Sequence, residues 1–200
     1  MRNFFIIFAL ISFSNLTFSQ KEKTIESKKW DVNNPHKDWN YKNFNLKTDE
    51  GTWMNLDVSP DGETIVFDML GDIYTMPITG GKATALRTGL AYEVQPRYSP
   101  DGTYISFTSD AGGGNNIWVM TADGQNAKAI TKEKYRLLNN AVWTPDGKSL
   151  VARKHYTSER SVGAGEMWQY PLVGSAGLQI TKRKNDQQDV NDPSISPDGR

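Results

Sequence analysis

Hydrophobic and polar residues alternate along short stretches of this chain, and each repeated stretch bends at the same four-residue corner. The corner begins at residues 59, 99, 144 and 196 with Ser or Thr, followed by Pro, Asp and Gly. These residue types suit a type I β-turn, because the hydroxyl caps the first position, Pro presets φ and Gly ends the turn. The pattern therefore predicts hairpin corners between β-strands.

A repeated strand pattern follows each corner. Apolar residues stand three and five positions beyond the corner glycine, which predicts one buried face of a strand. These residues are Ile65 and Phe67, Ile105 and Phe107, and Leu150 and Ala152. A later strand carries one aromatic residue per copy, namely Tyr74, Trp118 and Trp168. With the strand before the corner and a short edge strand at the end, each copy predicts a four-stranded antiparallel meander.

The copies have the length of β-propeller blades. The corners lie 40, 45 and 52 residues apart, near the roughly 40–50 residues of a propeller repeat. From the corner glycine to the strand aromatic the distance grows from 12 to 16 to 21 residues, while the rest of the copy changes little. We therefore expect the added residues in one loop, between the second and third strands, where they would decorate a single rim.

The chain divides into three predicted parts. Residues 1–20 have a basic start, an apolar run of ten residues and a polar end with small residues, which is typical of a secretory signal peptide and too short to span a bilayer. Residues 21–41 predict a polar N-terminal tether. Residues 42–200 predict an all-β, incomplete β-propeller of about three four-stranded antiparallel blades. The blades are expected at about 52–88, 95–131 and 140–181, with the start of a fourth at 190–200.

Two further strands are expected at the ends of the propeller region. Phe44 and Leu46 alternate with polar residues, which predicts a leading strand that would complete the last blade of a closed ring. Residues 192–195 predict the first strand of a fourth blade. Because propellers close with roughly 4–8 blades, about three blades predict the N-terminal piece of a longer polypeptide. Alone, such a piece is expected to aggregate or oligomerise.

Composition narrows the expected partners and location. The formal charge is zero, with 23 basic and 23 acidic residues, so the basic excess that attracts nucleic acid is missing. The chain has no Cys, which excludes a lipoprotein anchor and a disulfide framework. Together with the signal peptide, these features predict an exported protein, periplasmic or extracellular, with no nucleic-acid partner and no membrane span.

The repeat resembles the TolB-like, WD-repeat-like β-propeller repeat. The resemblance covers roughly residues 53–200 and is clearest in PRYSPDG from Pro96, ISFTSD from Ile105 and NIWVM from Asn116. Five stretches outside the generic repeat more narrowly resemble the N-terminal propeller of exported amidohydrolases. They are GTWMNLDVSPDG from Gly51, GDIYTMPITGG from Gly71, RLLNNAVWTPDG from Arg136, GAGEMW from Gly163 and TKRKNDQQD from Thr181.

The amidohydrolase resemblance implies a parent enzyme that hydrolyses a C–N bond in a C-terminal domain absent here. A divalent metal such as zinc would belong to that domain, and the propeller would gate, bind substrate or act as a scaffold. Two alternatives stay open: the propeller of a prolyl-oligopeptidase-like serine peptidase, and a TolB-like module that binds an envelope protein. The expected partners are the remaining blades, the catalytic domain and a protein or peptide ligand.

No catalytic, cofactor-binding or metal-binding residue is predicted in this chain. The two histidines, His36 and His155, lie 119 positions apart, and each is expected to be a solvated loop residue. The glycine-rich segments 112–114 and 163–165 are expected to be flexible loop, because neither precedes a helical pattern as a phosphate cradle would. The four corner aspartates are expected to be structural. They are Asp61, Asp101, Asp146 and Asp198.

Two features remain as candidates for binding. The aligned aromatics Tyr74, Trp118 and Trp168 predict inter-blade packing, with a stacking platform for sugars or peptides as the alternative. The long loop 154–166 is the best candidate for contact with a partner or a neighbouring domain, with a merely decorated rim as the alternative. Its charged residues and neighbours are Arg153, Lys154, Arg160 and Glu166.

Overall fold

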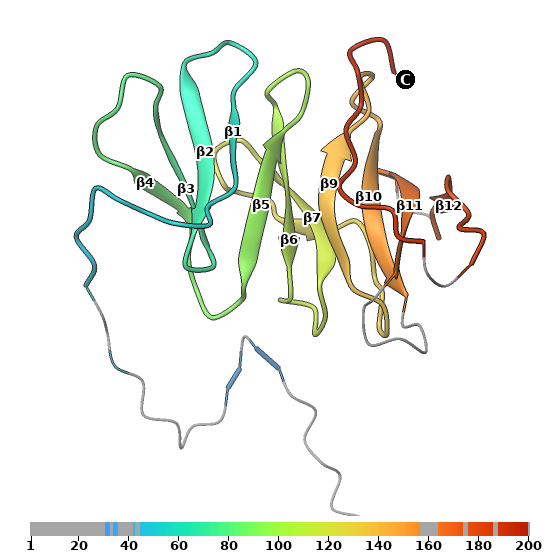
Figure 1. Cartoon of the computed structure of the whole chain (residues 1–200). Coiled ribbons are helices and arrows are strands. Elements are labelled where there is room, and N and C mark those ends of the chain that lie inside the picture. Colours follow the sequence, from blue (N-terminus) through green and yellow to red (C-terminus); the bar gives the residue numbers. More distant parts are fainter. Residues whose placement is uncertain are drawn as a thin grey trace, which may run out of the picture.

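A computed structural model describes residues 31–32, 34–35, 42, 45–156, 164–173, 176–185 and 188–199. Within these residues the only regular secondary structure is β-strand, arranged in three four-stranded antiparallel sheets (Figure 1). Each sheet forms one blade of an incomplete propeller. The predicted all-β class and the four-stranded meanders are confirmed.

The strands of each blade follow chain order from one edge of the sheet to the other. Blade 1 consists of β1 (Leu56–Val58), β2 (Thr64–Met69), β3 (Asp72–Pro77) and β4 (Thr84–Arg87). Blade 2 consists of β5 (Glu93–Tyr98), β6 (Tyr104–Ser109), β7 (Asn116–Thr121) and β8 (Lys128–Ala129). Blade 3 consists of β9 (Leu138–Trp143), β10 (Ser149–Tyr156), β11 (Ala164–Pro171) and β12 (Leu178–Gln179).

The predicted corners join the first two strands of each blade. In the first corner the Gly62 N–H donates to the Ser59 carbonyl at 2.8 Å, and the Ser59 hydroxyl donates to Asp61 Oδ1 at 2.5 Å. Equivalent bonds recur in the corners that begin at residues 99, 144 and 196. The corner glycine has φ between 65° and 81° in all four, a region that glycine adopts at little cost. The corner prediction is confirmed.

The blades stand side by side like a fan, with their first strands innermost (Figure 1). The strands β4, β8 and β12 form the outer edges. All four corners lie at one end of the fan, which we name the corner rim, at the top of Figure 1. The β2–β3 and β6–β7 connections lie at the opposite end, the loop rim. The inner strands therefore face a common axis that runs from one rim to the other.

Hydrophobic clusters fill the spaces between the blades. The cluster between blades 1 and 2 contains Val66, Ile73, Ile105, Phe107 and Met120, all almost completely buried. The cluster between blades 2 and 3 contains Ile117, Val119, Leu138, Leu150 and Tyr170, among others. Because each cluster takes residues from two blades, a blade is stabilised mainly by its neighbours.

The aligned strand aromatics take part in this packing. Trp118 packs against the cluster between blades 1 and 2, and Trp168 packs against the cluster between blades 2 and 3. Tyr74 instead stacks on Phe67 within blade 1, with ring centroids 5.7 Å apart. The structure therefore places two of the three aromatics in the inter-blade role that the sequence predicts.

A repeated backbone bond joins the start of each blade to the blade before it. The Glu93 N–H donates to the Gly71 carbonyl at 2.8 Å, and the Leu138 N–H donates to the Asn115 carbonyl at 3.0 Å. The Val190 N–H donates to the Gly165 carbonyl at 3.3 Å in the same way. Each donor lies six residues before its corner, so the segment after blade 3 takes the position of a next blade's first strand.

The two strands expected at the ends of the propeller region are not formed. Residues 45–50 contain no strand, and Leu46 is exposed, while Phe44 lies outside the described residues. Residues 192–195 are also without strand structure, although they follow Val190 against blade 3. An alternating segment becomes a strand only where a sheet edge pairs with its backbone groups, and neither segment forms such a ladder.

Candidate functional site

The inner strands share a pattern that is counted back from the corner hydroxyl. The residue four positions earlier is polar in every copy: Asn55, Gln95, Asn140 and Asp192. The residue two positions earlier changes type between copies: Asp57, Arg97, Val142 and Ser194. We name the surface that these eight positions form the axial face. The first of these positions is polar in all four copies, whereas the second varies in residue type. This difference indicates that the two positions have different roles.

The constant polar position links each blade to the next. Asp68 on β2, only 4% exposed, accepts from the Asn55 N–H at 3.0 Å and from the Gln95 N–H at 2.6 Å. The Gln95 Oε1 accepts from the Asn140 N–H at 2.9 Å, and the Asn140 amide donates to Asp192. A series of polar bonds thus runs from blade 1 to the segment after blade 3. The role of this position is structural.

β-Bulges make these backbone donors available. The register of β5 on β6 shifts between Val94 and Arg97, and the register of β9 on β10 shifts at the corresponding place. Gln95 and Asn140 have φ values of 60° and 51°, the left-handed region that non-glycine residues seldom adopt. A bulge takes one residue out of the ladder, so its N–H can donate to the neighbouring blade.

Arg97 is the only cation among the eight positions of the axial face. Its Nη1 donates to the carbonyl oxygens of Leu56 and Pro96, at 3.0 and 2.8 Å. Among the residues that the structure describes, it forms no ion pair with a carboxylate. A guanidinium held by neutral carbonyls keeps its full charge and its remaining donors. Arg97 can therefore bind an anionic group.

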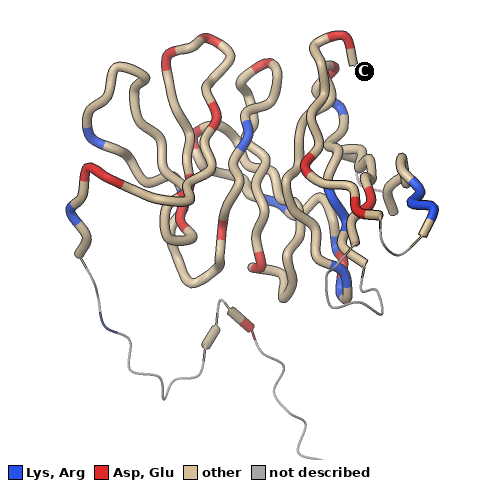
Figure 2. Tube along the Cα trace, in the orientation of Figure 1, with Lys and Arg blue, Asp and Glu red and all other residues tan. Residues whose placement is uncertain are grey.

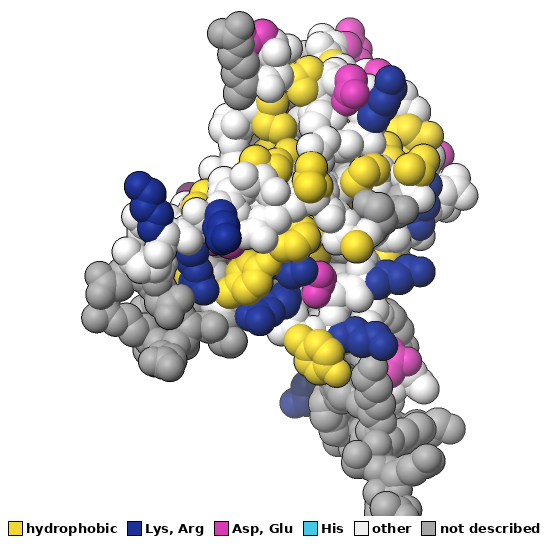
Figure 3. All heavy atoms as spheres, turned by 90° about the vertical axis from the view of Figure 1, so that its right-hand side faces the viewer, with side chains coloured by type: hydrophobic (Ala, Val, Ile, Leu, Met, Phe, Trp, Pro, Cys, Tyr) yellow, Lys and Arg dark blue, Asp and Glu magenta, His cyan; other side chains and the backbone are white. Residues whose placement is uncertain are grey.

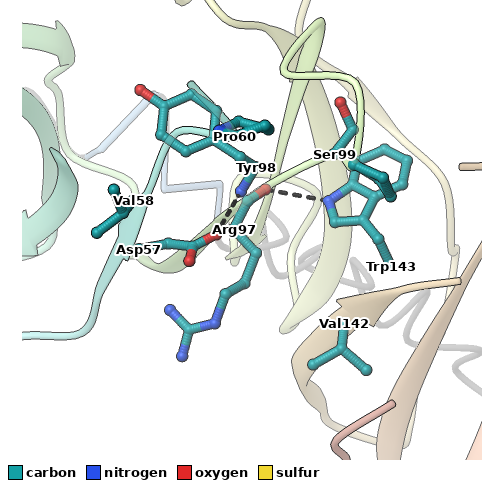
Figure 4. A pocket seen from close by; sticks show the side chains of 9 residues that line it. Asp57, Val58, Pro60, Arg97, Tyr98, Ser99, Val142 and Trp143 are labelled. Atoms are coloured by element: carbon teal, nitrogen blue, oxygen red, sulfur yellow. Dashed lines mark hydrogen bonds between the residues drawn. The ribbon is translucent and has the colours of Figure 1, made fainter. Parts of the chain in front are cut away.

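A hollow of about 350 Å³ opens beside Arg97 toward the corner rim. In Figure 4 the guanidinium points into the space between Asp57 and Val142. The Trp143 Nε1 donates to the Arg97 carbonyl at 3.0 Å, and the Tyr98 N–H donates to Asp57 Oδ2 at 2.8 Å (Figure 4). These bonds fix the wall of the hollow from blades 1 and 3.

A second hollow of about 280 Å³ lies on the other side of Arg97. Arg97 and Val142 line both hollows, so the two form one continuous surface along the axis. Its polar lining comes from the constant position, with Asn55, Gln95, Asn140 and Asp192. Amide groups beside one guanidinium suit the recognition of a carboxylate or of a peptide backbone.

Charge in the corner-rim hollow comes from Arg97 and Asp57. Burial raises the pKa of Tyr98, and the negative charge of Asp57 raises it further, so this phenol stays neutral at physiological pH. Within the described part of the chain, no group of three or more His, Cys, Asp or Glu residues is placed to hold a metal ion.

The structure corrects the expectation for His155. This residue lies on β10 and is half-buried, with its Nε2 hydrogen-bonded to Asn139 Oδ1 at 2.9 Å. Burial lowers the pKa of His155, and the nearby charge of Arg153 lowers it further. It is therefore a packed strand residue and not a solvated loop residue. His36 lies outside the described residues.

The loop 154–166 is shorter than the sequence suggests. Residues 154–156 continue β10 and residues 164–166 begin β11, in one unbroken ladder. Of the segment 163–165, Ala164 and Gly165 are therefore buried strand residues and not flexible loop, and residue 163 lies outside the described ones. A Cβ on Gly165 would lie 2.6 Å from the Val190 carbonyl oxygen, so glycine permits the close approach of the next segment. Residues 112–114 do lie in a loop, as expected.

The corner aspartates have the structural role that the sequence predicts. In each of the first three corners the carboxylate accepts from the corner hydroxyl and from a following N–H. The hydroxyl bond, followed by the N–H bond, lowers the pKa of Asp61, Asp101 and Asp146 below the ordinary value of 3.8. These carboxylates form hydrogen bonds within their own turns.

Sequence reasoning missed Asp68, Gln95 and Arg97, which build and charge the axial face. Their signal is distance from the corner, since Gln95 and Arg97 stand four and two positions before Ser99. Alignment of the copies on the corner hydroxyl would have found both positions. Asp68 gives no such signal, because the residues at its place in the other blades, Thr108 and Arg153, are chemically different.

Comparison with known proteins agrees with this architecture. Repeated four-stranded blades around an axis define a β-propeller domain. The chain belongs to the tricorn protease N-terminal β-propeller domain family, whose model matches residues 54–200. The solved structure of TolB from Acinetobacter baumannii superposes with a TM-score of 0.59 at 23% identity, over 75% of this chain and 36% of that one. The predicted TolB-like propeller is confirmed.

Two similar proteins carry peptidase names. Tricorn protease homolog 1 of Streptomyces coelicolor is 32% identical over 92 residues, which are 46% of this chain and 9% of that protein. The uncharacterized peptidase YuxL of Bacillus subtilis is 29% identical over 134 residues, covering 52% of this chain and 20% of that protein. The chain thus spans 9% and 20% of the length of these two relatives. In the described residues, no helix has the length and apolar character needed to cross a bilayer.

Proposed function

We propose that this propeller binds substrate for a larger exported hydrolase, with a peptidase as the parent protein. The family match and the two peptidase relatives support this reading. The partial coverage of those relatives is consistent with a binding domain joined to further blades and to a catalytic domain. In this proposal the axial face guides an extended, carboxylate-bearing substrate toward that domain.

The position of Arg97 carries the proposal. Its guanidinium separates the two hollows, is held by neutral carbonyls and forms no ion pair among the described residues. A fixed guanidinium binds a carboxylate through two parallel hydrogen bonds. Because these two carbonyl bonds hold the Arg97 side chain in place, it loses little conformational entropy when a ligand binds.

The amidohydrolase parent is the second candidate, supported by the five stretches that resemble exported amidohydrolase propellers. The relatives reported above add no support to it, and a TolB-like binding module is the third candidate. The sequence that follows residue 200 separates them. A Gly-x-Ser-x-Gly motif would support the serine peptidase, His-x-His would support the metal-dependent amidohydrolase, and a closed ring without a catalytic domain would support the binding module.

Substitution of Arg97 tests the binding role. In the complete polypeptide, Arg97→Gln should lower kcat/KM for peptides with a free carboxylate about tenfold, and should change that for amidated peptides little. Arg97→Lys should retain part of the preference, because it keeps the charge and loses the planar fork. Lys128→Gln on the exposed part of β8 removes the same charge elsewhere and is the matched control. Equal losses for both peptide classes would contradict the proposal.

Export forms a separate part of the proposal. Residues 1–20 lie outside the described residues and carry the signal-peptide pattern. We expect cleavage after this segment and a periplasmic or extracellular mature protein. N-terminal sequencing of the mature protein tests it, and retention of residues 1–20 in a cytoplasmic product would contradict it. Any divalent metal would belong to the catalytic domain of an amidohydrolase parent.

A further inference from the structure

Positively charged side chains are concentrated on blade 3 at the loop rim. In Figure 2 blue segments lie at the lower end of blade 3 and in the loop after β12. Figure 3, which faces blade 3, shows Lys and Arg side chains interleaved with hydrophobic ones. We name these cations the basic rim. They are Lys132, Lys134, Arg136, Lys182, Arg183 and Lys184.

Tyr156 at the end of β10 brings the two parts of the basic rim together. The Arg136 Cζ lies 4.6 Å from the centroid of the Tyr156 ring, and the Arg183 Cζ lies 5.8 Å from it. Arg136 precedes β9 and Arg183 follows β12, so one ring bridges segments from both edges of the sheet. Contact of guanidinium groups with an aromatic ring is attractive and orients their planes.

Much of this positive charge is not neutralised within the described residues. Lys154 pairs with Glu133, and Arg183 Nε lies 3.8 Å from the buried Glu166. Arg136 and the four lysines of the basic rim pair with no carboxylate there. Four of the six cations are therefore exposed lysines that keep their charge toward solvent.

Apolar side chains lie among these cations. Tyr135 and Leu137, on either side of Arg136, are 93% and 51% exposed. Exposed apolar groups beside unpaired cations are typical of protein interaction surfaces. A free anion would use the charges and leave the apolar groups in water. A polypeptide with acidic and apolar residues would use both.

We infer that the basic rim docks an acidic polypeptide segment that also carries apolar side chains. A flat anionic membrane fits less well, because the loop rim of blades 1 and 2 carries Asp72 and Asp110 and would be repelled. An extended segment is narrow enough to contact blade 3 alone. This surface lies at the loop-rim end of blade 3, and none of its six cations lines the two hollows beside Arg97, so the inference is independent of the proposed axial function.

Fluorescence anisotropy with a labelled peptide of Glu-Glu-Leu repeats tests the inference on the complete polypeptide. The double variant Lys182→Glu/Lys184→Glu should weaken peptide binding about tenfold, because two attractive contacts become repulsive. Lys82→Glu/Lys128→Glu makes the same charge change at exposed positions of blades 1 and 2, and should change the affinity less than about twofold. Arg136→Gln should weaken binding about threefold.

Two further measurements complete the test: the salt dependence of peptide binding, and binding to anionic lipid vesicles. Affinity for the peptide should fall steadily as salt is raised, because exposed charges are screened. A peptide of Lys-Lys-Leu repeats should not bind. Equal loss in the two double variants, or stronger binding to phosphatidylglycerol vesicles than to the acidic peptide, would overturn the inference. Circular dichroism of each variant confirms that the exposed substitutions leave the fold intact.

Discussion

The corner rim and the loop rim of the same three blades are built in opposite ways. Every corner uses the same hydroxyl, the same carboxylate and a glycine with positive φ, and its bonds stay within one exposed turn. The loop rim joins blades 1 and 2 through the ion pair of Arg87 with Glu93, which has no counterpart of the same chemistry at the next junction. Repetition therefore shapes the blades, and unrepeated residues join them.

The largest expected loss of folding stability comes from breaking the Arg87–Glu93 ion pair at the loop rim. Arg87 donates three hydrogen bonds of 2.8–3.0 Å to Glu93, whose side chain is 3% exposed. Glu93→Ala should lower the free energy of unfolding by about 3 kcal/mol, because it leaves a partly buried guanidinium without its partner. Urea unfolding followed by tryptophan fluorescence measures this.

Glu63→Ala at the corner rim is the matched control, because Glu63 is exposed. Its effect should stay within about 0.5 kcal/mol. Equal effects of the two substitutions would mean that the junction does not depend on the ion pair.

A smaller effect is expected from a corner glycine. Gly62 has φ of 75°, and a Cβ there would meet no atom within 4 Å, so the cost of a side chain is conformational only. Gly62→Ala should lower the free energy of unfolding by about 1 kcal/mol. Gly62→Asn should cost less, since Asn adopts this region more readily. A larger loss for Asn than for Ala would contradict the conformational explanation.

Acid should lower the stability that the corner carboxylates contribute. The pKa of Asp61, Asp101 and Asp146 is lower in the folded chain than the ordinary 3.8. Their stabilisation is therefore complete above pH 3.8 and is lost as pH falls through the folded values. The triple substitution to Asn should reduce this acid-dependent loss of stability, measured as urea midpoints at pH 7 and pH 3. An unchanged loss would show that other carboxylates cause it.

The smallest expected effect concerns His155. Its pKa is lowered from the ordinary 6.5, chiefly by burial, so folding favours the neutral ring. Stability should be complete above pH 6.5 and should fall as pH drops below it, until the folded value is reached. His155→Gln should remove this change between pH 7 and pH 5 in thermal melts, whereas His36→Gln should retain it. Identical profiles for wild type and His155→Gln would contradict the assignment.

The two rims also differ in how well the sequence predicted them. Corner residues determine their own turn through local bonds, so the tetrapeptide predicted the corners and the strands around them. The partners of Asp68 and Glu93 come from other strands or blades, and an alternating pattern does not specify such partners. The bulges at Gln95 and Asn140 were not predicted either, because no particular residue type marks a bulge and only the strand pairing shows it.

The arrangement of side chains around Lys154 was also only partly predicted. The segment around Lys154 was expected to contact a partner, and the basic rim does lie beside it. Lys154 lies on an extended strand, and this placement depends on strand pairing. The contacts of Tyr156 with Arg136 and Arg183 also depend on pairing across the whole sheet. The formal charge of zero concealed this local excess of positive charge.

The backbone bond between the start of one blade and the carbonyl of the previous one gives the fold a modular character. Gly71, Asn115 and Gly165 present the acceptor, and the donor always stands six residues before a corner. A duplicated blade would bring the same backbone donor and acceptor with it, so this bond could form again at each new junction. An engineered chimera with an added blade would therefore need new side-chain partners between blades, such as a replacement for the Arg87–Glu93 ion pair, but no new backbone connection.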